Sequence, residues 1–155
     1  MDLYLMQHGE ATAEADDPAR PLTSAGRATV AQVAARARSA GVRIDTCVHS
    51  GKLRAEQSAQ VLADAVAGGR VESKDGLAPN DPVGPVARWL GERTEESSIA
   101  LVGHLPFLDR LASSLISGEE NGQVISFQMG GLVKLVPKRE QDGFAVAWVL
   151  APDVA

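Results

Sequence analysis

Short apolar segments alternate along the chain with longer segments whose apolar residues recur at helical spacing. The short runs stop at polar residues or at glycine, as buried strands do, whereas the longer Ala-rich and Leu-rich segments are typical of helices. The pattern predicts strands over residues 3–6, 44–49, 99–103, 124–128, 132–136 and 144–150, a short strand starting at Val71, and helices over 25–40, 53–67, 86–95 and 106–117.

Turn and capping residues support these boundaries. Thr23 or Ser24 is a suitable cap for the first helix, and Gly41 is a usual residue just beyond a helix end. Pro, Gly and Asn residues make 75–82 a loop, and the charged segment 138–143 joins the last two strands like a hairpin.

Strands that alternate with helices imply parallel pairing, because a parallel strand needs a long crossover before its next neighbour. The fold class expected is therefore α/β, in three α/β/α layers around a mainly parallel central sheet. A chain of 155 residues can bury one good core and is short for two, so we expect a single domain over 1–155.

Composition excludes several classes of function. The formal net charge of −5 argues against a general nucleic-acid-binding protein, which needs a basic face. Cys47 is the sole cysteine, which excludes an internal disulfide and fits a reducing compartment. Neither a secretion signal nor an apolar stretch long enough to span a membrane is present, so we expect a cytoplasmic protein that does not bind membranes.

Three predicted strands end at residues that can handle phosphate. Gln7, His8 and Gly9 follow the first strand, the segment 50–57 (SGKLRAEQ) brings Arg54 after the second, and His104 follows the strand over 99–103. In an open parallel sheet, ligands bind at the carboxyl ends of the strands. Arg54 offers a planar fork that suits phosphate oxygens and His104 a further hydrogen bond, so the sequence predicts a phosphoryl pocket.

His8 is the candidate nucleophile of this pocket. A neutral imidazole can attack phosphorus and hold the phosphoryl group until water removes it, while Gly9 lets the backbone approach the phosphate closely. Fixed cations and donors stabilise the charge on the equatorial oxygens, so this chemistry needs neither a metal nor another cofactor.

Four segments in this order resemble one known family. They are the His-Gly pair after the first strand, Arg20-Pro21-Leu22-Thr23 with Gly26, the segment 50–57, and Gly103-His104-Leu105-Pro106. The chain is similar to the histidine phosphatase (phosphoglycerate mutase-like) superfamily and, within it, to the small phosphohistidine phosphatases of the SixA type.

The resemblance implies a phosphoglycerate mutase-like fold, His8 as the phosphorylated residue, and Arg54 and His104 as catalytic phosphate ligands. It also implies that the substrate is phosphohistidine on a protein, such as a histidine phosphorelay domain, or a small phosphoester. Where the family has Arg-His-Gly, this chain has Gln7, which still donates from its amide but carries no charge. The loss should cost about 1 to 3 kcal/mol of phosphate or transition-state binding.

Arg20 or Lys52 could restore part of that charge, and Gln7, Gly9 and Arg20 are candidate phosphate-binding residues. Arg20 could equally be a surface charge that balances neighbouring aspartates. The glutamate that larger relatives use as a general acid is absent, because Ala78 and Pro79 follow Leu77. Asp81 is the nearest carboxylate and a possible general acid, although phosphohistidine is labile and its imidazole leaves easily.

Other chemistries fit the sequence less well. His49 also ends a strand and is either a pocket residue or a solvated turn side chain. Cys47 and Arg54 are one residue too far apart for a Cys-x5-Arg phosphate loop, and neither metal-ligand spacing nor a glycine-rich nucleotide motif occurs. The alternative function is a noncatalytic phosphate or phosphohistidine binding module, which Gln7 and the missing acid would favour.

Overall fold

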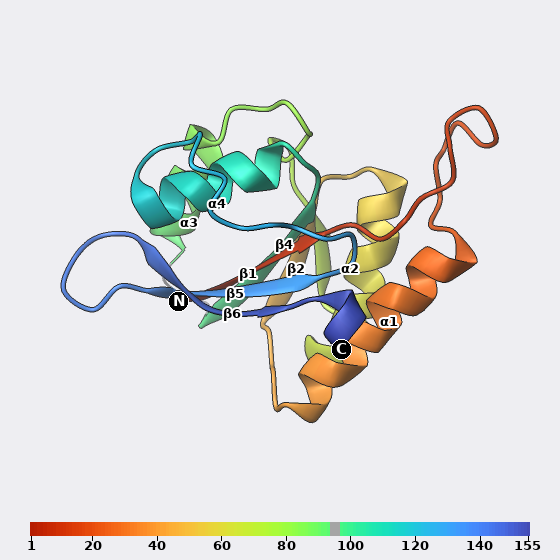
Figure 1. The fold of residues 1–155 in the computed structure, drawn as a ribbon, viewed down its shortest axis with the longest axis horizontal. Coiled ribbons are helices and arrows are strands. Elements are labelled where there is room, and N and C mark those ends of the chain that lie inside the picture. Colours follow the sequence, from red (N-terminus) through yellow and green to blue (C-terminus); the bar gives the residue numbers. More distant parts are fainter. Residues whose placement is uncertain (94–96) are drawn as a thin grey trace.

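The computed structural model describes residues 1–93 and 97–155, in which strands and helices alternate along most of the chain (Figure 1). The strands are β1 (Asp2–Gln7), β2 (Thr46–His49), β3 (Val71–Ser73), β4 (Ser98–Gly103), β5 (Leu132–Pro137) and β6 (Phe144–Leu150). The helices are α1 (Ser24–Ser39), α2 (Leu53–Val66), α3 (Gly84–Glu92), α4 (Phe107–Ser117) and the short 3-10 turn η1 (Pro152–Val154).

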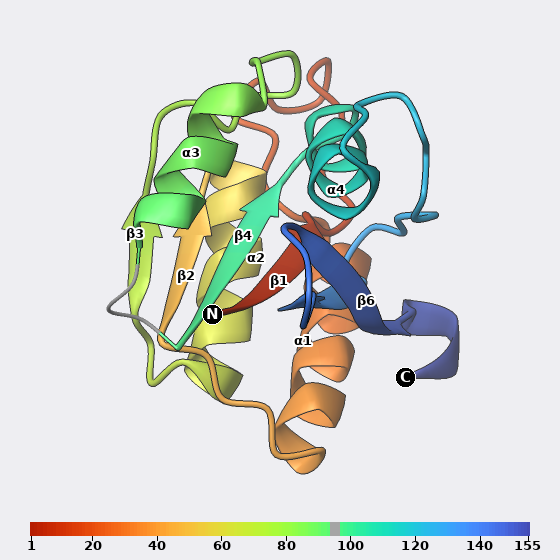
Figure 2. The ribbon, with the colours of Figure 1, turned by 90° about the vertical axis from the view of Figure 1, so that its left-hand side faces the viewer.

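One six-stranded sheet runs in the order β3-β2-β4-β1-β5-β6. The first four of these strands are parallel to one another, while β5 pairs antiparallel with β1 and with β6. Helices α3 and α4 cover one face and α1 and α2 the other (Figure 2). The three-layer fold with a mainly parallel sheet is thus confirmed.

Side chains of β1 alternate between the two halves of the core. Leu3 and Leu5 pack with α3 and α4, whereas Tyr4 and Met6 pack with α1 and α2, and all four are buried. Successive residues of a strand point to opposite faces, so a strand with helices on both faces is apolar throughout. This double burial fixes the direction in which β1 delivers its last residues.

Parallel pairing brings three strand ends to one edge of the sheet. Gln7 at the end of β1 lies opposite Gly103 at the end of β4, and His49 at the end of β2 lies opposite Val102. The backbone N–H of His8 continues the ladder by donating to the Gly103 carbonyl at 3.0 Å. The expected adjacency of these three strands is therefore confirmed.

The strand predicted over 124–128 is wrong, because this segment has no regular structure. The strand that follows it, β5, is paired on both sides, with β1 and β6, and the segment joins none of the six strands. Only Ile125 of its apolar side chains is buried, while Val124 is 41% exposed. The helix predicted over 86–95 is present as α3, and its predicted end at Glu95 lies outside the described residues.

Candidate active site

His8 lies directly after β1 and is nearly buried, with 9% of its surface exposed. Its Nδ1 atom is 2.7 Å from the carbonyl oxygen of Gly9. A carbonyl can only accept a hydrogen bond, so Nδ1 carries the proton and Nε2 keeps its lone pair. The backbone thereby holds His8 in the tautomer that a nucleophile attacking through Nε2 requires.

His104 lies beside His8, with 5.0 Å between the two ring centroids. It follows β4, is 2% exposed, and its Nε2 lies 2.6 Å from the hydroxyl of Ser50. Its Nδ1 is buried without a hydrogen-bond partner. A buried polar nitrogen without a partner is costly, so this atom favours a ligand that can bond to it.

Arg54, in the first turn of α2, presents a second buried atom of this kind, because its Nε also lacks a partner. An arginine N–H can only donate, so an acceptor is needed. Among the described residues three buried side-chain nitrogens have no partner, and two of them belong to Arg54 and His104. Together these two atoms indicate a site for an anion.

Burial and neighbouring cations keep both histidines neutral. Burial lowers the pKa of His8, the hydrogen bond to Gly9 partly offsets this, and Arg54 and Arg20 lower the pKa further. Burial, followed by His8 and Arg54, lowers the pKa of His104 to about 3. The pKa of Arg54 also falls, through burial and the charge of Arg20. A neutral His8 is the form that can attack phosphorus.

The loop that carries His8 packs tightly against the start of α1. A Cβ atom on Gly26 would overlap the backbone of Glu10, and one on Gly9 would lie 2.9 Å from the Gly26 carbonyl oxygen. The Thr23 hydroxyl caps the helix by accepting from the Gly26 N–H at 2.9 Å and also donates to the Glu10 carboxylate. The spacing of Thr23 and Gly26 is therefore a packing requirement of the loop.

Helix α2 holds the same loop from the other side. The Ser58 hydroxyl accepts from the Gly9 N–H at 3.0 Å and donates to the Arg54 carbonyl at 2.7 Å. Gln57 accepts from the Leu22 N–H through Oε1 at 2.8 Å. These bonds fix the turn of helix that carries Arg54 relative to the backbone that carries His8.

Two known proteins and one family model are similar to this chain. The phosphohistidine phosphatase SixA of Escherichia coli (strain K12) is 32% identical over 123 residues, which cover 77% of this chain and 76% of that protein. An uncharacterized protein of Picosynechococcus sp. is 34% identical over 140 residues, which cover 87% of this chain and 84% of the relative. The family model of the histidine phosphatase superfamily (branch 1) matches residues 3–79. The chain belongs to the histidine phosphatase superfamily.

The fold of this superfamily member is also similar to a solved structure, that of the protein histidine phosphatase SixA complexed with tungstate. The two superpose with a TM-score of 0.86 at 27% identity, over 99% of this chain and 98% of that one. The resemblance inferred from the four sequence segments is thus confirmed at the level of the family and of its SixA-like members.

Arg20 acts electrostatically on the candidate site. It follows the loop after β1 with a φ of 50°, and its Nε donates to the Thr12 carbonyl at 3.1 Å. Its charge lowers the pKa of His8, of His104 and of Arg54. Because the charge of Arg20 acts on these three residues, a role at the site is favoured over that of a surface charge.

Lys52 and Gln7 are close in sequence to Arg54 and His8. Lys52 precedes α2, and its charge lowers the pKa of His104. Gln7 is the last residue of β1, and its carbonyl accepts from the Gly130 N–H at 2.8 Å. The backbone of Gln7 thus anchors the loop before β5, while positive charge comes from Arg20, Lys52 and Arg54.

Asp81, the candidate acid, closes the loop before α3. One carboxylate oxygen accepts from the Ala78 N–H at 2.9 Å, and the Asp81 carbonyl accepts from Arg110 at 2.6 Å. The charged groups that lower the pKa of His8 and His104 are cations of other segments. These contacts give Asp81 a structural task, and its role as a proton donor stays a prediction.

Replacing Asp81 by asparagine tests that role. The amide oxygen of Asn can still accept from Ala78, so we expect phosphohistidine hydrolysis to change by less than about threefold. Steady-state assays with a phosphohistidine protein and with p-nitrophenyl phosphate measure this, and Asp75→Asn is the matched control in the same loop. A loss of about tenfold or more in Asp81→Asn alone would identify Asp81 as the general acid.

The remaining candidates have other surroundings. His49 is 5% exposed, and its Nδ1 accepts from the Gly51 N–H at 3.1 Å, so it is a buried turn residue rather than a solvated one. Cys47 is fully buried in β2, and burial raises its pKa to about 12, which rules out a thiolate nucleophile at neutral pH.

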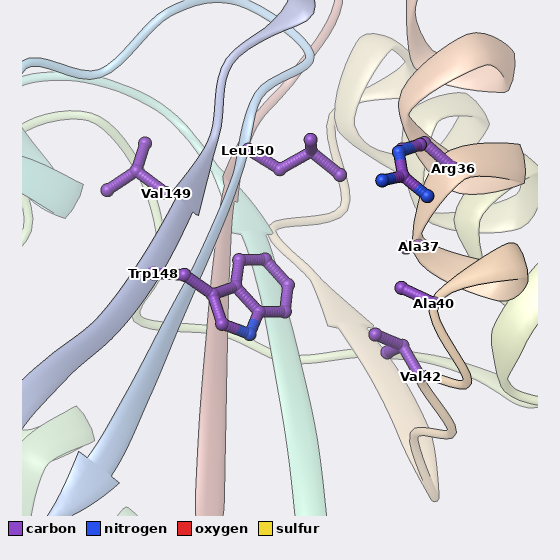
Figure 3. A pocket seen from close by; sticks show the side chains of 7 residues that line it. All are labelled: Arg36, Ala37, Ala40, Val42, Trp148, Val149 and Leu150. Atoms are coloured by element: carbon purple, nitrogen blue, oxygen red, sulfur yellow. The ribbon is translucent and has the colours of Figure 1, made fainter. Parts of the chain in front are cut away.

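Within residues 1–93 and 97–155, no group of three or more His, Cys, Asp or Glu residues is placed to hold a metal ion. In the same part of the chain, every helix is too short or too polar to cross a membrane. A hollow of about 220 Å³ lies between the end of α1 and β6, where Arg36, Val42, Trp148 and Leu150 line it (Figure 3). No histidine lines it, and His8 and His104 lie instead just after β1 and β4, at the carboxyl edge of the sheet.

Two contributors to the site were not assigned roles from the sequence. Ser50 contacts His104, and Ser58 joins the loop of His8 to Arg54. Ser50 lies within the 50–57 segment, so its position next to a strand end is the signal that could have found it. Ser58 lies one turn after Arg54 on α2, which puts it on the same helix face.

The pKa of His104 predicts an acid-sensitive fold. In the unfolded chain this histidine takes up a proton near pH 6.5, whereas in the folded protein its pKa is about 3. Acid therefore favours the unfolded chain between these two values, and the stability that the group contributes is complete only above about pH 6.5. We expect the free energy of unfolding to fall by up to about 1.4 kcal/mol per pH unit from His104 alone.

Urea unfolding of the phosphate-free protein at about pH 7 and about pH 5 measures this slope. His104→Gln removes the titrating group, so the variant should lose less stability between the two pH values than the wild type. Equal losses in the two proteins would contradict the low pKa of His104.

Proposed function

We propose that this protein is a phosphohistidine phosphatase that removes the phosphoryl group from a histidine of another protein through an intermediate on His8. The observation that carries the proposal is the tautomer of His8, because the Gly9 carbonyl holds the proton on Nδ1 and leaves the Nε2 lone pair free. The buried donors of Arg54 and His104 beside this ring suit the oxygens of the phosphoryl group.

The reaction divides into two transfers at phosphorus. Nε2 of His8 attacks the phosphorus atom, the P–N bond of the substrate breaks, and the substrate ring, already protonated on its other nitrogen, leaves as a neutral imidazole. Water then attacks phosphorus, the bond to Nε2 of His8 breaks, and inorganic phosphate leaves with His8 restored. In both steps Arg54 and His104 stabilise the charge on the equatorial oxygens.

Two features support phosphohistidine over an ordinary phosphoester. The segment Leu77-Ala78-Pro79 has no glutamate, and an alkoxide leaving group needs a proton donor more than an imidazole does. The curated relative of Escherichia coli bears the name phosphohistidine phosphatase. The substrate proposed is therefore a phosphorylated protein, such as a histidine phosphorelay domain, and a small phosphoester is the second choice.

The test compares three substrates at equal concentration. These are a phosphohistidine-containing relay domain, free phosphohistidine and p-nitrophenyl phosphate, with release of inorganic phosphate as the measurement. Faster turnover of the relay domain supports the proposal. Tight binding of the phosphorylated domain without turnover would instead support the binding module, the function that Gln7 in place of arginine favours.

Restoring arginine at position 7 tests whether other cations compensate. Arg20 and Lys52 act on His104, and Arg20 also acts on His8. We expect Gln7→Arg to raise kcat/KM for phosphohistidine by less than about tenfold, because the pocket already has three cations. Steady-state kinetics measure this, and a rise of about 100-fold or more would show that nothing compensates.

The same hypothesis predicts that Arg20→Gln lowers kcat/KM more in the wild type than in the Gln7→Arg background. The double-mutant cycle of Gln7→Arg and Arg20→Gln gives the coupling between the two positions. Arg27→Gln, at an exposed position of α1, is the matched control for the loss of one arginine. Additive effects in the cycle would exclude Arg20 as the substitute.

A further inference from the structure

Ser50 and His104 are 54 positions apart in the sequence and meet at the edge of the sheet. Ser50 is the first residue after β2 and His104 the first after β4, and these strands are parallel neighbours. The Ser50 hydroxyl oxygen lies 2.6 Å from Nε2 of His104. At this distance one of the two atoms must donate a proton to the other.

The other bonds of Ser50 indicate which atom donates. The Lys52 N–H donates to the Ser50 oxygen at 3.3 Å, which already uses that oxygen as an acceptor. That bond uses only one of the two lone pairs of the oxygen, so the hydroxyl proton decides the direction. Among the described residues, Nε2 of His104 is the one acceptor within hydrogen-bond distance of this proton, so Ser50 donates to His104. A neutral imidazole that accepts at Nε2 carries its own proton on Nδ1.

Nδ1 of His104 is the atom that needs this proton. It is buried without a hydrogen-bond partner, and the cations Arg54, Lys52 and Arg20 act on the ring. An anion among these groups can accept a bond from an Nδ1–H, whereas a lone pair on Nδ1 would repel it. Burial among cations keeps the ring neutral, so only one of its two nitrogens can donate.

We propose that Ser50 is a positioning residue, which holds His104 in the tautomer with the proton on Nδ1 so that the neutral ring donates to the phosphoryl group. The proposal rests on the proposed function only for the identity of the anion. The two histidines of the pocket are then held by different hydrogen-bond partners. A backbone carbonyl fixes His8 with a free Nε2 lone pair, and a serine hydroxyl fixes His104 with a free Nδ1–H.

Long-range 1H–15N NMR of the histidine side chains tests this tautomer without any turnover. The chain has three histidines, and His49→Gln and His104→Gln assign their signals. With inorganic phosphate bound, wild-type His104 should show a protonated Nδ1 and an unprotonated Nε2. In Ser50→Ala the signals should shift toward a protonated Nε2, and in Ser50→Thr, which keeps the hydroxyl, they should match the wild type.

Phosphate affinity provides the second readout. We expect Ser50→Ala to weaken the binding of inorganic phosphate by about tenfold or more, and Ser50→Thr to weaken it by less than about threefold. Ser39→Ala, at the exposed end of α1, is the control and should change neither tautomer nor affinity. A protonated Nε2 in the wild type, or unchanged His104 signals in Ser50→Ala, would overturn the proposal.

These outcomes separate the proposal from the proposed function. The expected tautomer and phosphate affinities in a protein that hydrolyses no phosphohistidine would support the role of Ser50 and contradict the phosphatase. Phosphohistidine turnover, together with a His104 tautomer that is the same in the wild type and in Ser50→Ala, would support the phosphatase and contradict the role of Ser50.

Discussion

Replacing His8 by alanine should abolish phosphohistidine hydrolysis, with a fall in kcat of about 1000-fold or more. The variant lacks the Nε2 lone pair that attacks phosphorus, and neither Arg54 nor His104 can replace it. Arg54 is a cation, and His104 contacts Ser50 through Nε2. Release of inorganic phosphate from a phosphorylated relay domain measures the loss. After a brief incubation with substrate that carries a labelled phosphoryl group, the wild-type protein should hold acid-labile labelled phosphate and His8→Ala should not.

His49→Asn is the matched control for the loss of one buried histidine. Its amide oxygen can accept from the Gly51 N–H as Nδ1 of His49 does, so turnover should stay within about threefold of the wild type. The His8→Ala variant should still bind inorganic phosphate, since Arg54 and His104 remain. Turnover by His8→Ala at the wild-type rate would exclude His8 as the nucleophile.

Replacing Arg54 by alanine should lower kcat/KM by about 100- to 10,000-fold, the range that follows the loss of one preorganised charged donor. Arg54 presents a buried Nε without a protein partner, so its charge is directed at a ligand rather than at the fold. Steady-state kinetics measure the loss, and Arg54→Lys should recover only part of it, because lysine lacks the planar fork.

Two further measurements separate a catalytic effect of Arg54 from a structural one. Arg54 lowers the pKa of both His8 and His104, so the acid limb of the residual activity should move to higher pH in Arg54→Ala. Burial and the charge of Arg20 also disfavour the charged form of Arg54. Removing the Arg54 side chain should therefore not destabilise the phosphate-free protein. Arg38→Ala, at an exposed position of α1, is the control. A marked drop in stability of Arg54→Ala would indicate a structural role.

Most of the fold could be predicted because the inner strands β1, β2 and β4 are buried on both faces. A run such as Leu3 to Met6 has no polar alternation, and this marks it as an inner strand of a parallel sheet. The exception was the segment 124–128, which has the composition of a strand. Pairing is a property of the whole sheet, and β5 already has two neighbours, so local composition could not show that the segment has no partner.

The sequence by itself determined the family, the order of the strands along the chain, and the positions of His8, Arg54 and His104 after three of them. These follow from local patterns, namely apolar runs, capping residues and the segments around each strand end. It also showed that Gln7 stands where the family has arginine, and it left open whether Arg20 lies at the site or on the surface.

Only the tertiary structure decided which protons the two histidines carry. The tautomer of His8 depends on a carbonyl 2.7 Å away, and that of His104 on a hydroxyl from a different strand. It also placed Arg20 among the cations that act on both rings. Hydrogen bonds and electrostatic effects depend on distances of a few ångströms between segments remote in sequence, and only the packing of the sheet and its helices sets those distances.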